Sequence, residues 1–562
     1  IRENYIQEPN FVEFGLNEFS ITDVNGDGDL VINPGETIEL IIEIEIDENW
    51  PANASDVILN LLSNEDDVNI LNDQDYILGL NPGENYQNNE NPFLIQFSND
   101  AIFKDYEFVL SLSYISENAN TYSSEFYINL EVSQNQFGFP YETGSSVESS
   151  PIIVDIDSDG VNEIIFGDYS GNLNICEPIM DNCIVFNTGG QIWGSPAVHD
   201  IDNDGEFEIV ISSVDKYIYI LNPHGELEAS YYCDQFLVGT PAIGNLDDDP
   251  EFEIVIGGYT NNGQIFVINH DGSGVENFPI TINEKMKNGA GLADVDNDGK
   301  EEIFIGTESN NFYRINPNGT IYNNTPILIA EDKIKFDPVI VGFNNNFQIF
   351  VGSNDNNLYS VSPNGDINFV YETNDDVLSS VSIVSYSEQN FGILFSSEDG
   401  NIYFIDANGE NMPGWPRYSG YNYNSTPIIS DLDCNGIPDI IATGSSYIQT
   451  FQFNGEEYNS PIDLVQTVKG SPYVMDFDDD GDLEIFSGTN FNLYGIDGEY
   501  PCSGVEEINY SMFRVNNKRN GFLNFDLLKI NPILTPISFE ISKIYPNPFN
   551  PNFTLEISIG KI

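Results

Sequence analysis

A stretch of about 18 residues recurs along the chain, and no other feature limits the possible folds so strongly. Its first copies read SPIIVDIDSDGVNEIIFG from Ser150, SPAVHDIDNDGEFEIVIS from Ser195 and TPAIGNLDDDPEFEIVIG from Thr240. Each copy contains two strand patterns around an acidic loop. The copies repeat every 43 to 49 residues, with corresponding positions at Pro151, Pro196, Pro241, Ala290, Pro338, Val381, Pro427 and Pro472.

A repeat of this length that contains only strand patterns predicts the blades of a β-propeller. A third strand follows in each copy, as in YIYILNPHG from Tyr217, and an Asn-Gly or similar turn leads to an outer strand. We therefore expect an all-β chain with an eight-bladed propeller, and seven blades as the alternative. Residues 139–143 (FPYET) precede the first copy and predict an outer strand that completes the eighth blade, with a linker as the alternative.

Strand-like alternation without helical periodicity also fills the first part of the chain. Thr37–Ile46 reads TIELIIEIEI, and clusters of Asn, Pro and Gly separate such runs. About seven short strands in roughly 130 residues predict an immunoglobulin-like sandwich. The predicted domains are a sandwich at 1–136, the propeller at 137–524 and a C-terminal tail at 525–562.

The chain carries 91 acidic residues against 17 basic ones, a formal charge of −74. Nucleic acid is not expected as a partner, because phosphate binding needs clustered Lys and Arg, and an anionic membrane surface is unsuited for the same reason. So much negative charge opposes compaction unless cations bind to it. No apolar run is long enough to predict membrane insertion.

The cysteines are too few to form a disulfide scaffold. Cys176 and Cys183 are close enough in sequence to bridge a short loop, whereas Cys233, Cys434 and Cys502 have no obvious partners. The chain begins without Met and without a signal peptide, which fits a processed, exported protein and equally a recombinant one.

The acidic loop of the first copy has oxygen ligands at a spacing that suits calcium. Asp155, Asp157 and Asp159 are two residues apart, so their side chains can converge, and the glycine that follows permits a sharp bend. Glu163 begins the next strand and closes the site. Calcium takes about six to eight hard oxygens, and the main-chain carbonyl of Val161 is a further candidate. Without a cation, carboxylates this close would repel and some would be protonated.

Five further copies carry the same pattern, so six blade loops are predicted to bind calcium. Magnesium fits less well, because a flexible loop with many ligands suits the larger ion. The predicted ligands are Asp200, Asp202, Asp204, Glu206 (carbonyl) and Glu208; Asn245, Asp247, Asp249 and Glu253, with Pro250 in place of glycine; Asp294, Asp296, Asp298, Lys300 (carbonyl) and Glu302; Asp431, Asp433, Asn435, Ile437 (carbonyl) and Asp439; and Asp476, Asp478, Asp480, Asp482 (carbonyl) and Glu484.

The fifth and sixth copies lack this charge. At the three early positions they carry Gly342, Asn344 and Asn346, and Ser385, Ser387 and Gln389. These residues bring no carboxylate, so we expect no calcium in these two loops.

The repeated units resemble the FG-GAP and VCBS repeats of integrin-type and bacterial extracellular propellers. The resemblance spans the predicted propeller, and six of the eight loops match it well. It implies calcium in the hairpin loops, where the ion makes the blades rigid. Pro250 and the two degenerate loops depart from the family pattern.

A related acidic stretch lies in the N-terminal domain. Asp23, Asn25 and Asp27 alternate as in the blade loops, and Glu36 follows within NPGE. This stretch resembles the DxNGDG…NPGE entry of bacterial adhesion-type sandwich domains. We predict a calcium ion held by these four residues, with an acidic surface turn as the alternative.

The tail contains KIYPNPFNP from Lys543 and a further strand-like run at 554–559. YPNPFNP resembles the start of the C-terminal sorting domain used by type IX secretion in Bacteroidota and relatives. The resemblance implies export to the outer surface of a Gram-negative bacterium or release from it. Several more strands are usual in that family, so the tail is expected to be processed, truncated or paired elsewhere as a donor strand.

Residues with recognisable catalytic patterns are scarce. Of the three histidines, His199 is expected to pack beside the second loop, and His224 and His270 lie in turns that are usually exposed. Trp193 and Trp415 precede blade starts and are expected to be packing anchors. Some eight-bladed calcium-binding propellers are polysaccharide lyases, but the low Lys and Arg content counts against a lyase.

The sequence therefore predicts a non-enzymatic, secreted surface or matrix protein that acts in adhesion or as a structural subunit, with a fibre as one form. Its expected partners are further copies of itself, bound head to tail or by strand addition, and cell-surface glycans or other extracellular proteins. A lectin-like carbohydrate-binding module is the alternative, and a polysaccharide lyase is a weaker one.

Overall fold

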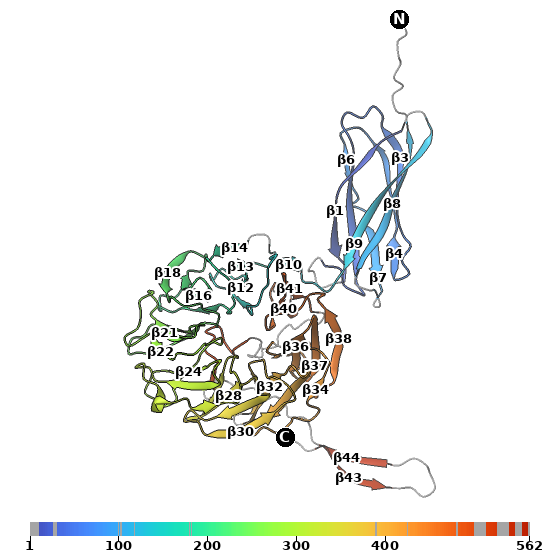
Figure 1. Cartoon of the computed structure of the whole chain (residues 1–562). Helices are drawn as coiled ribbons and strands as arrows, with labels where there is room; N and C mark the ends of the chain where they lie inside the picture. Colours follow the sequence, from blue (N-terminus) through green and yellow to red (C-terminus); the bar gives the residue numbers. More distant parts are fainter. Residues whose placement is uncertain are drawn as a thin grey trace. The chain divides into compact units, whose positions relative to one another are not determined.

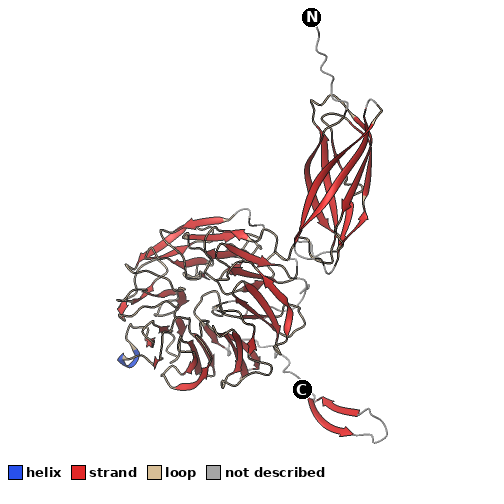
Figure 2. Cartoon of the chain, turned by 45° about the vertical axis from the view of Figure 1, so that its right-hand side comes forward, coloured by secondary structure: helices blue, strands red, loops and turns tan. Residues whose placement is uncertain are grey.

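The structure is a computed structural model that describes residues 11–524, with gaps at 26–30, 99–100, 102–103, 117–118, 179, 181–182, 388–389, 424, 479–480 and 499–512, and also the strands at 539–545 and 554–559. The described regular structure is β-strand apart from one 3-10 turn, η1 (Tyr322–Asn324), which confirms an all-β chain (Figure 2). No helix in this described part has the length and apolar character to cross a membrane.

The chain divides into two compact units, residues 1–140 with 479–484 and 495–501, and the remaining residues. In the tail, β43 (Phe539–Tyr545) pairs with β44 (Thr554–Ile559) in an antiparallel hairpin. Most of the YPNPFNP motif lies outside the described residues.

The first unit is a sandwich of two antiparallel sheets that share one hydrophobic core. The alternation in sequence builds this core: in β2, Ile38, Leu40 and Ile42 are fully buried and alternate with less buried residues. The immunoglobulin-like strand order stays a prediction. One sheet contains β1 (Phe14–Asp23), β2 (Thr37–Ile46), β7 (Phe93–Phe97) and β4 (Val68–Asn72), with β6 (Asn85–Gln87) beside β2; the other contains β5 (Gln74–Leu80), β3 (Ala54–Ser63), β8 (Lys104–Ser116) and β9 (Thr121–Val132).

The second unit is a β-propeller, in which small antiparallel sheets follow one another around a ring (Figure 1). Eight such sheets lie in the described part of the chain, and we number them blades 1 to 8 in chain order. Each blade begins with its inner strand and continues outward strand by strand, so neighbours in sequence are neighbours in the sheet.

The first four blades are β11 (Ile152–Val154), β12 (Glu163–Gly167), β13 (Asn172–Cys176) and β14 (Ile184–Asn187); β15 (Ala197–His199), β16 (Glu208–Ser212), β17 (Tyr217–Leu221) and β18 (Leu227–Tyr232); β19 (Ala242–Gly244), β20 (Glu253–Gly257), β21 (Gln264–Ile268) and β22 (Ile280–Thr281); and β23 (Gly291–Ala293), β24 (Glu302–Gly306), β25 (Asn311–Ile315) and β26 (Leu328–Ile329).

The last four are β27 (Val339–Phe343), β28 (Asn346–Gly352), β29 (Asn357–Val361) and β30 (Ile367–Glu372), with β42 (Phe522–Asn524) beside β27; β31 (Ser382–Ser387), β32 (Asn390–Ser396), β33 (Asn401–Asp406) and β34 (Arg417–Tyr418); β35 (Ile428–Ser430), β36 (Asp439–Gly444), β37 (Tyr447–Gln452) and β38 (Glu457–Asp463); and β39 (Tyr473–Met475), β40 (Glu484–Gly488) and β41 (Asn492–Ile496), with β10 (Tyr141–Glu142) as the outer strand.

The first strand of the propeller closes its last blade. Tyr141 of β10 lies opposite Leu493 of β41, and Glu142 lies opposite Asn492. This pairing confirms the predicted closure and shows that residues 139–143 are not simply a linker. It joins the two ends of the propeller in one sheet.

Adjacent blades pack face to face through strands that are buried on both sides. All five residues of β12 are buried, and Ile165 and Ile175 of blade 1 join Val198 and Ile209 of blade 2 in one cluster. Burial on both faces explains why these strands read as continuous apolar runs and do not alternate. The first residue of β12 is nevertheless Glu163, which places a carboxylate at the edge of the core.

The structure tests the predictions about cysteine. Cys176 and Cys183 form a disulfide, as predicted. Cys434 is disulfide-bonded as well, which corrects the expectation that it has no partner. Cys233 is a buried free thiol, and Cys502 lies outside the described residues.

Residues 513–524, here called the channel segment, run along the inside of the ring. Four of its carbonyls accept hydrogen bonds from the inner strands of blades 2, 3, 4 and 5 in turn, and β42 pairs in parallel with β27. One segment thus satisfies donors on the inner edges of four blades. This position could not be predicted from the sequence, because the segment belongs to no repeat. The bonds run from the N–H groups of Val198, Ile243, Leu292 and Ile340 to the carbonyls of Asn517, Lys518, Asn520 and Gly521, at 2.8 to 3.0 Å.

Candidate metal centre

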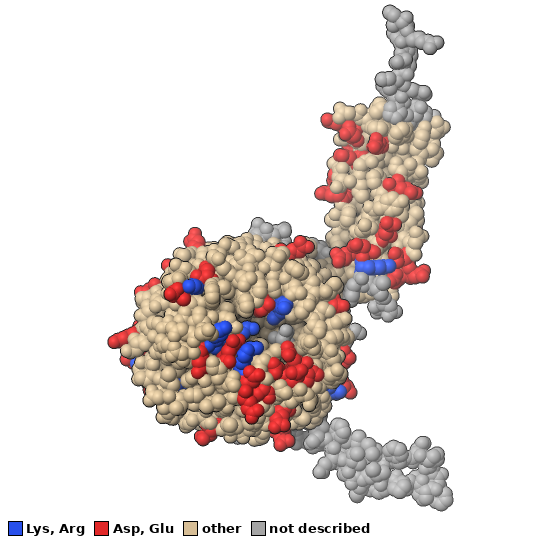
Figure 3. All heavy atoms as spheres, viewed as in Figure 1, with Lys and Arg blue, Asp and Glu red and all other residues tan. Residues whose placement is uncertain are grey.

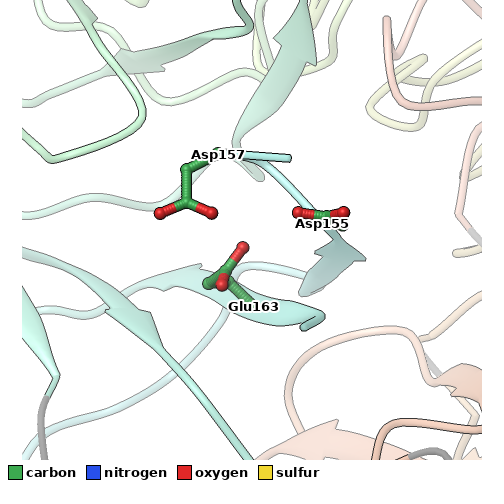
Figure 4. A group of neighbouring side chains, drawn as sticks. All are labelled: Asp155, Asp157 and Glu163. Carbon is green, nitrogen blue, oxygen red and sulfur yellow. The ribbon is translucent and has the colours of Figure 1, made fainter. Parts of the chain in front are cut away.

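Each predicted metal loop leaves the end of an inner strand and turns tightly into the second strand of the same blade. In blade 1 the loop runs from Asp155, directly after β11, to Glu163, the first residue of β12. Asp155, Asp157 and Glu163 point toward one another (Figure 4), and each offers a carboxylate oxygen within 4.8 Å of the others. Oxygens that each lie about 2.3–2.6 Å from one calcium ion are at most about 5.2 Å apart, so this spacing fits the ion.

Backbone hydrogen bonds hold the loop in shape. The Asp155 carboxylate accepts the N–H groups of Asp159 at 3.0 Å and Gly160 at 3.1 Å. Gly160 has a φ of 95°, and a Cβ there would meet no atom within 4 Å. The glycine is therefore needed for its backbone conformation and not for space. The equivalent loop glycines have φ values from 83° to 103°: Gly205, Gly299, Gly436 and Gly481.

The last acid of each loop is its most buried ligand. Glu163 is 6% exposed, and its carboxylate accepts the Ile156 N–H at 2.9 Å. Burial, and then the charges of Asp157 and Asp159, raise the pKa of Glu163 to about 7. A divalent cation among these carboxylates would favour their ionised forms. Burial likewise raises the pKa of the corresponding acids, to about 8 for Glu208 and Glu253 and to about 7 for Glu302 and Asp439.

The same convergence of three acids occurs in at least five of the six predicted loops. In four of them the first, second and last acids come together, and in the third loop the second, third and last acids do so. Each set can supply three oxygen ligands to one ion. The sets are Asp155, Asp157 and Glu163; Asp200, Asp202 and Glu208; Asp247, Asp249 and Glu253; Asp294, Asp296 and Glu302; and Asp431, Asp433 and Asp439.

In most loops the residue at the third position makes a hydrogen bond within the loop and is not one of the three converging acids. Its side-chain oxygen accepts the N–H group two residues further on, which makes a local turn. The carbonyl groups of Val161, Glu206, Lys300 and Ile437 stay predicted ligands. The pairs are Asp159 with Val161, Asp204 with Glu206, Asp298 with Lys300 and Asn435 with Ile437, at 2.7 to 2.9 Å.

The third loop differs because proline replaces glycine. Pro250 cannot adopt a positive φ, and no residue of this loop, which is described in full, has a positive φ. The Asn245 amide turns onto its own loop and donates to the Asp249 carbonyl at 3.1 Å. This bond engages the amide nitrogen of Asn245, and its side-chain oxygen stays a predicted ligand.

Two predicted sites are only partly within the described residues. In blade 8, Asp482 and Glu484 are buried and Asp476 and Asp478 are half-buried, whereas Asp480 lies outside the described residues. The N-terminal site is likewise incomplete, because Asp27 lies outside. Of its other predicted ligands, Asp23 ends β1, the Asn25 side chain accepts the Thr37 N–H at 2.6 Å, and the buried Glu36 accepts the Asn33 N–H at 2.8 Å.

The fourth loop contains a cation that sequence reasoning missed. The buried guanidinium of Arg314, in β25, lies 3.4 Å from Glu302 and 3.6 Å from Asp296. Arg314 pairs with Phe304 across the blade as Ile175 pairs with Ile165 in blade 1. The signal was present in the sequence as a lone Arg in FYRINPNG, where the other third strands have uncharged residues.

In blade 5 a tight hairpin stands where the metal loops lie in other blades. β27 and β28 pair as far as Phe343 and Asn346, so only Asn344 and Asn345 form the turn. Both have positive φ, 48° and 60°, as a type I′ turn requires. In blade 6, Ser387 lies opposite Asn390, and Gln389 falls outside the described residues. The blade 5 connection therefore forms no acidic loop.

His199 has the packing role expected of it. Its ring meets Phe252 edge to face at 4.6 Å between centroids. Burial, followed by the charge of Lys518, lowers the pKa of His199 to about 4. It is therefore neutral at physiological pH.

No protein-family model matches the chain, and no curated protein sequence is similar to it. Among solved structures it is similar to the biofilm matrix protein Bap1 of V. cholerae, with 12% identity over 70% of this chain and 95% of that chain and a TM-score of 0.49. BamB from Moraxella catarrhalis has 13% identity over 62% and 99% of the two chains, with a TM-score of 0.44. The Dos1 propeller has 9% identity over 64% and 94%, also with a TM-score of 0.44. We assign no function from these similarities.

Proposed function

We propose that this chain is a secreted calcium-binding protein of the bacterial cell surface or extracellular matrix, built on FG-GAP or VCBS-type repeats. It acts in adhesion or as a structural subunit, and calcium makes the propeller blades rigid. The observation that carries this proposal is one carboxylate arrangement that recurs in five loops, each with a buried acid at its base. Five such arrangements at one place in the fold are better explained by bound cations than by solvated turns.

Two features support a location outside the cell. Calcium sites of extracellular modules bind at about 10⁻⁴–10⁻³ M, so loops with a few carboxylates are saturated there without high affinity. The disulfide between Cys176 and Cys183 forms and persists in an oxidising compartment. The sorting-like motif in the tail points the same way, through its resemblance to type IX secretion signals.

A non-enzymatic role is part of the proposal. The proposed metal loops use their acids as ligands, and the channel segment pairs with the inner edges of four blades. His199 is half-buried and neutral. A polysaccharide lyase remains the weaker alternative, and incubation with acidic polysaccharides followed by chain-length analysis would reveal it.

Chelation tests the calcium proposal. A ligand that binds only the folded state stabilises it, so removal of calcium with a chelator should lower the melting temperature by more than about 5 °C, and added calcium should restore it. Magnesium at the same concentration should restore less. An unchanged melting curve after chelation would contradict the proposal.

Assembly with further copies is the proposed route to a fibre or matrix, through head-to-tail contacts or strand addition. Negative-stain electron microscopy of the native protein should show ordered polymers. A population of only monodisperse particles would contradict the fibre and leave adhesion to glycans or other extracellular proteins as the role.

A further inference from the structure

The inner strands of the propeller start from a ring of hydroxyl groups, at the ends opposite the acidic loops. The Ser150 N–H donates to the Ser195 hydroxyl at 2.9 Å, and the Ser195 N–H donates to the Thr240 hydroxyl at 3.1 Å. The same bond joins Thr426 to Ser471 at 2.9 Å and Ser471 back to Ser150 at 3.0 Å. Each hydroxyl accepts an amide proton, so its own O–H proton remains available to donate.

These five hydroxyl groups line one cavity of about 250 Å³. At about 30 Å³ for each water in the liquid, this is room for roughly eight waters. Trp193, Phe336 and Phe513 supply apolar surface to the same cavity. A ligand that fills it would therefore meet both hydroxyl donors and aromatic surface.

Three of the few basic residues also line this cavity: Lys287, Lys335 and Lys469. In Figure 3, Lys and Arg side chains lie around the hollowed centre of the propeller, with Asp and Glu side chains beside them. The two acids in the cavity wall already have cations, since Glu148 lies 3.9 Å from Lys469 and Asp337 lies 3.9 Å from the buried Arg514.

Lys287 and Lys335 are left as half-buried ammonium groups that form no ion pair with any acid among the described residues. In a chain with 91 acids and 17 bases, two such lysines at one cavity are unexpected unless an anion from outside binds there. Lys287 lies 6.0 Å from the centre of the Trp193 ring, and the charge of Lys335 opposes the raised pKa of Glu398. Neither contact is an ion pair, so a bound anion would offset the remaining cost of their partial burial.

The floor of the ring is also cationic. Arg519 is fully buried and donates to the carbonyls of Pro151 at 2.8 Å and Pro196 at 3.2 Å. Arg514 donates to the Ala290 carbonyl, and a Cβ on Gly289 would collide with its guanidinium. Gly289 thus leaves the space that Arg514 occupies, and the channel segment holds both arginines beneath the hydroxyl ring.

We propose that this cavity binds the carboxylate or sulfate group of an acidic saccharide. Lys287 and Lys335 supply the charge, the hydroxyl ring supplies hydrogen bonds, and Phe336 and Phe513 pack against the sugar ring. The cavity is small enough for one sugar unit at the end or in a bend of a chain. Carboxylated and sulfated sugars share this chemistry, and the probes below separate them.

The choice of a saccharide rests on the proposed extracellular role, whereas the anion site itself does not. The site lies at the opposite ends of the inner strands from the acidic loops: in β15, Pro196 precedes the strand and Asp200 follows it. Binding should therefore be the same with and without calcium at a temperature where both forms are folded. Failure of the calcium proposal would leave this proposal standing, and the reverse also holds.

Isothermal titration of the full chain tests the site, with trigalacturonate, a sulfated disaccharide, neutral maltotriose and triglutamate as probes at low salt. The variants are Lys287→Gln and Lys335→Gln. The control is Lys216→Gln, which removes the same charge from a lysine that pairs with Asp234 at 2.9 Å and does not line the cavity. Unchanged calcium-dependent melting curves show that the variants fold.

We expect at least one acidic saccharide to bind, and each cavity variant to weaken its binding about tenfold or more, as for loss of a hydrogen bond to a charged group. The control should bind as the unmodified chain does, and added salt should weaken binding. Equal binding of maltotriose, preference for triglutamate, equal loss in the control, or no binding by any acidic saccharide would each overturn the proposal.

Discussion

The acidic loops of blades 1 to 4 and the hairpin of blade 5 both join the first strand of a blade to the second. They are stabilised by different interactions. In blade 2 the connection from His199 to Glu208 is held by carboxylates that accept backbone N–H groups around an open cage. In blade 5 the strands continue pairing up to Phe343 and Asn346, and only two residues turn. The hairpin needs no ion for its turn geometry. In the acidic loop of blade 2, here called a cage, the carboxylates of Asp200, Asp202 and Glu208 face one another.

This difference means that calcium should matter to some blades and not to others. A hairpin gains its stability from strand pairing and turn geometry, which do not depend on cations. A cage of carboxylates is destabilising when empty and stabilising when filled.

Removal of calcium is expected to have the largest effect, because it should make the stability of the protein fall as pH rises. Glu208 has an ordinary pKa of 4.5 and a folded-state pKa of about 8, and the other four cage acids are shifted in the same direction. A raised folded-state pKa contributes stability that is present below about pH 4.5 and is lost as pH rises through 7 to 8. Metal-free protein should therefore melt at lower temperature at pH 8 than at pH 5.5, by more than about 5 °C.

Calcium-loaded protein should lack this decline, because the ion binds the ionised carboxylates and gains affinity as pH rises. Thermal melts at several pH values, with calcium or with chelator, give both curves. A decline of equal size in the presence of saturating calcium would show that the acids titrate without an ion between them.

A smaller effect of opposite sign in the two conditions is expected for Glu208→Gln. In saturating calcium the amide is a weaker ligand, so one calcium per chain should be lost and the melting temperature should fall by about 2–4 °C. In chelator the same change removes a buried carboxylate among carboxylates and should raise the melting temperature.

The control for this variant is Asp366→Asn, which neutralises an exposed acid in blade 5. It should shift the melting temperature by less than about 1 °C in both conditions. A fall of equal size for Glu208→Gln with and without calcium would mean that the Glu208 carboxylate binds no calcium ion, because the amide oxygen can still accept the Ile201 N–H.

The fourth loop allows a finer comparison, between cages with and without an internal cation. Arg314→Ile gives this position the residue found at Ile175 and Ile220 in blades 1 and 2, and it removes the guanidinium from Asp296 and Glu302. We expect the fourth site to bind calcium about tenfold more tightly, since a positive charge 3.4 Å from a ligand repels the ion.

Calorimetric titration of calcium should resolve this change as one site of higher affinity, and Lys216→Gln should leave the titration unchanged. In chelator the Arg314 variant should be less stable, because two carboxylates lose their partner. A titration that does not change would show that the fourth loop binds no calcium.

The propeller and the acidic triads could be predicted from the sequence because both are local patterns. Strand pairing within a blade joins neighbours in the chain, and the acids of one loop lie within nine residues of each other, as Asp155 and Glu163 do. The outer strand at Tyr141 was also predictable, because a ring must bring its first and last strands together.

The features that the sequence did not show depend on contacts between distant residues. Arg514 and Arg519 lie in no repeat, and nothing local indicates that they are buried against Pro151, Pro196 and Ala290. The hydroxyl ring is an intermediate case. The recurring Ser/Thr-Pro pairs were visible and served only to mark the period, whereas their role in joining blades appears only in three dimensions.

The smallest expected effect is a change in melting temperature on substitution of Asn345 in the hairpin of blade 5. Asn345 has a φ of 60°, which glycine adopts without strain, and Asn-Gly is the preferred pair in a type I′ turn. Asn345→Gly should therefore raise the melting temperature slightly, by about 1 °C or less, and by the same amount with calcium and with chelator. Differential scanning calorimetry of both forms can resolve such a shift. If the gain appeared only in calcium, the hairpin would be coupled to the cages, and blades 1 to 4 could no longer be treated as a separate calcium-dependent part of the ring.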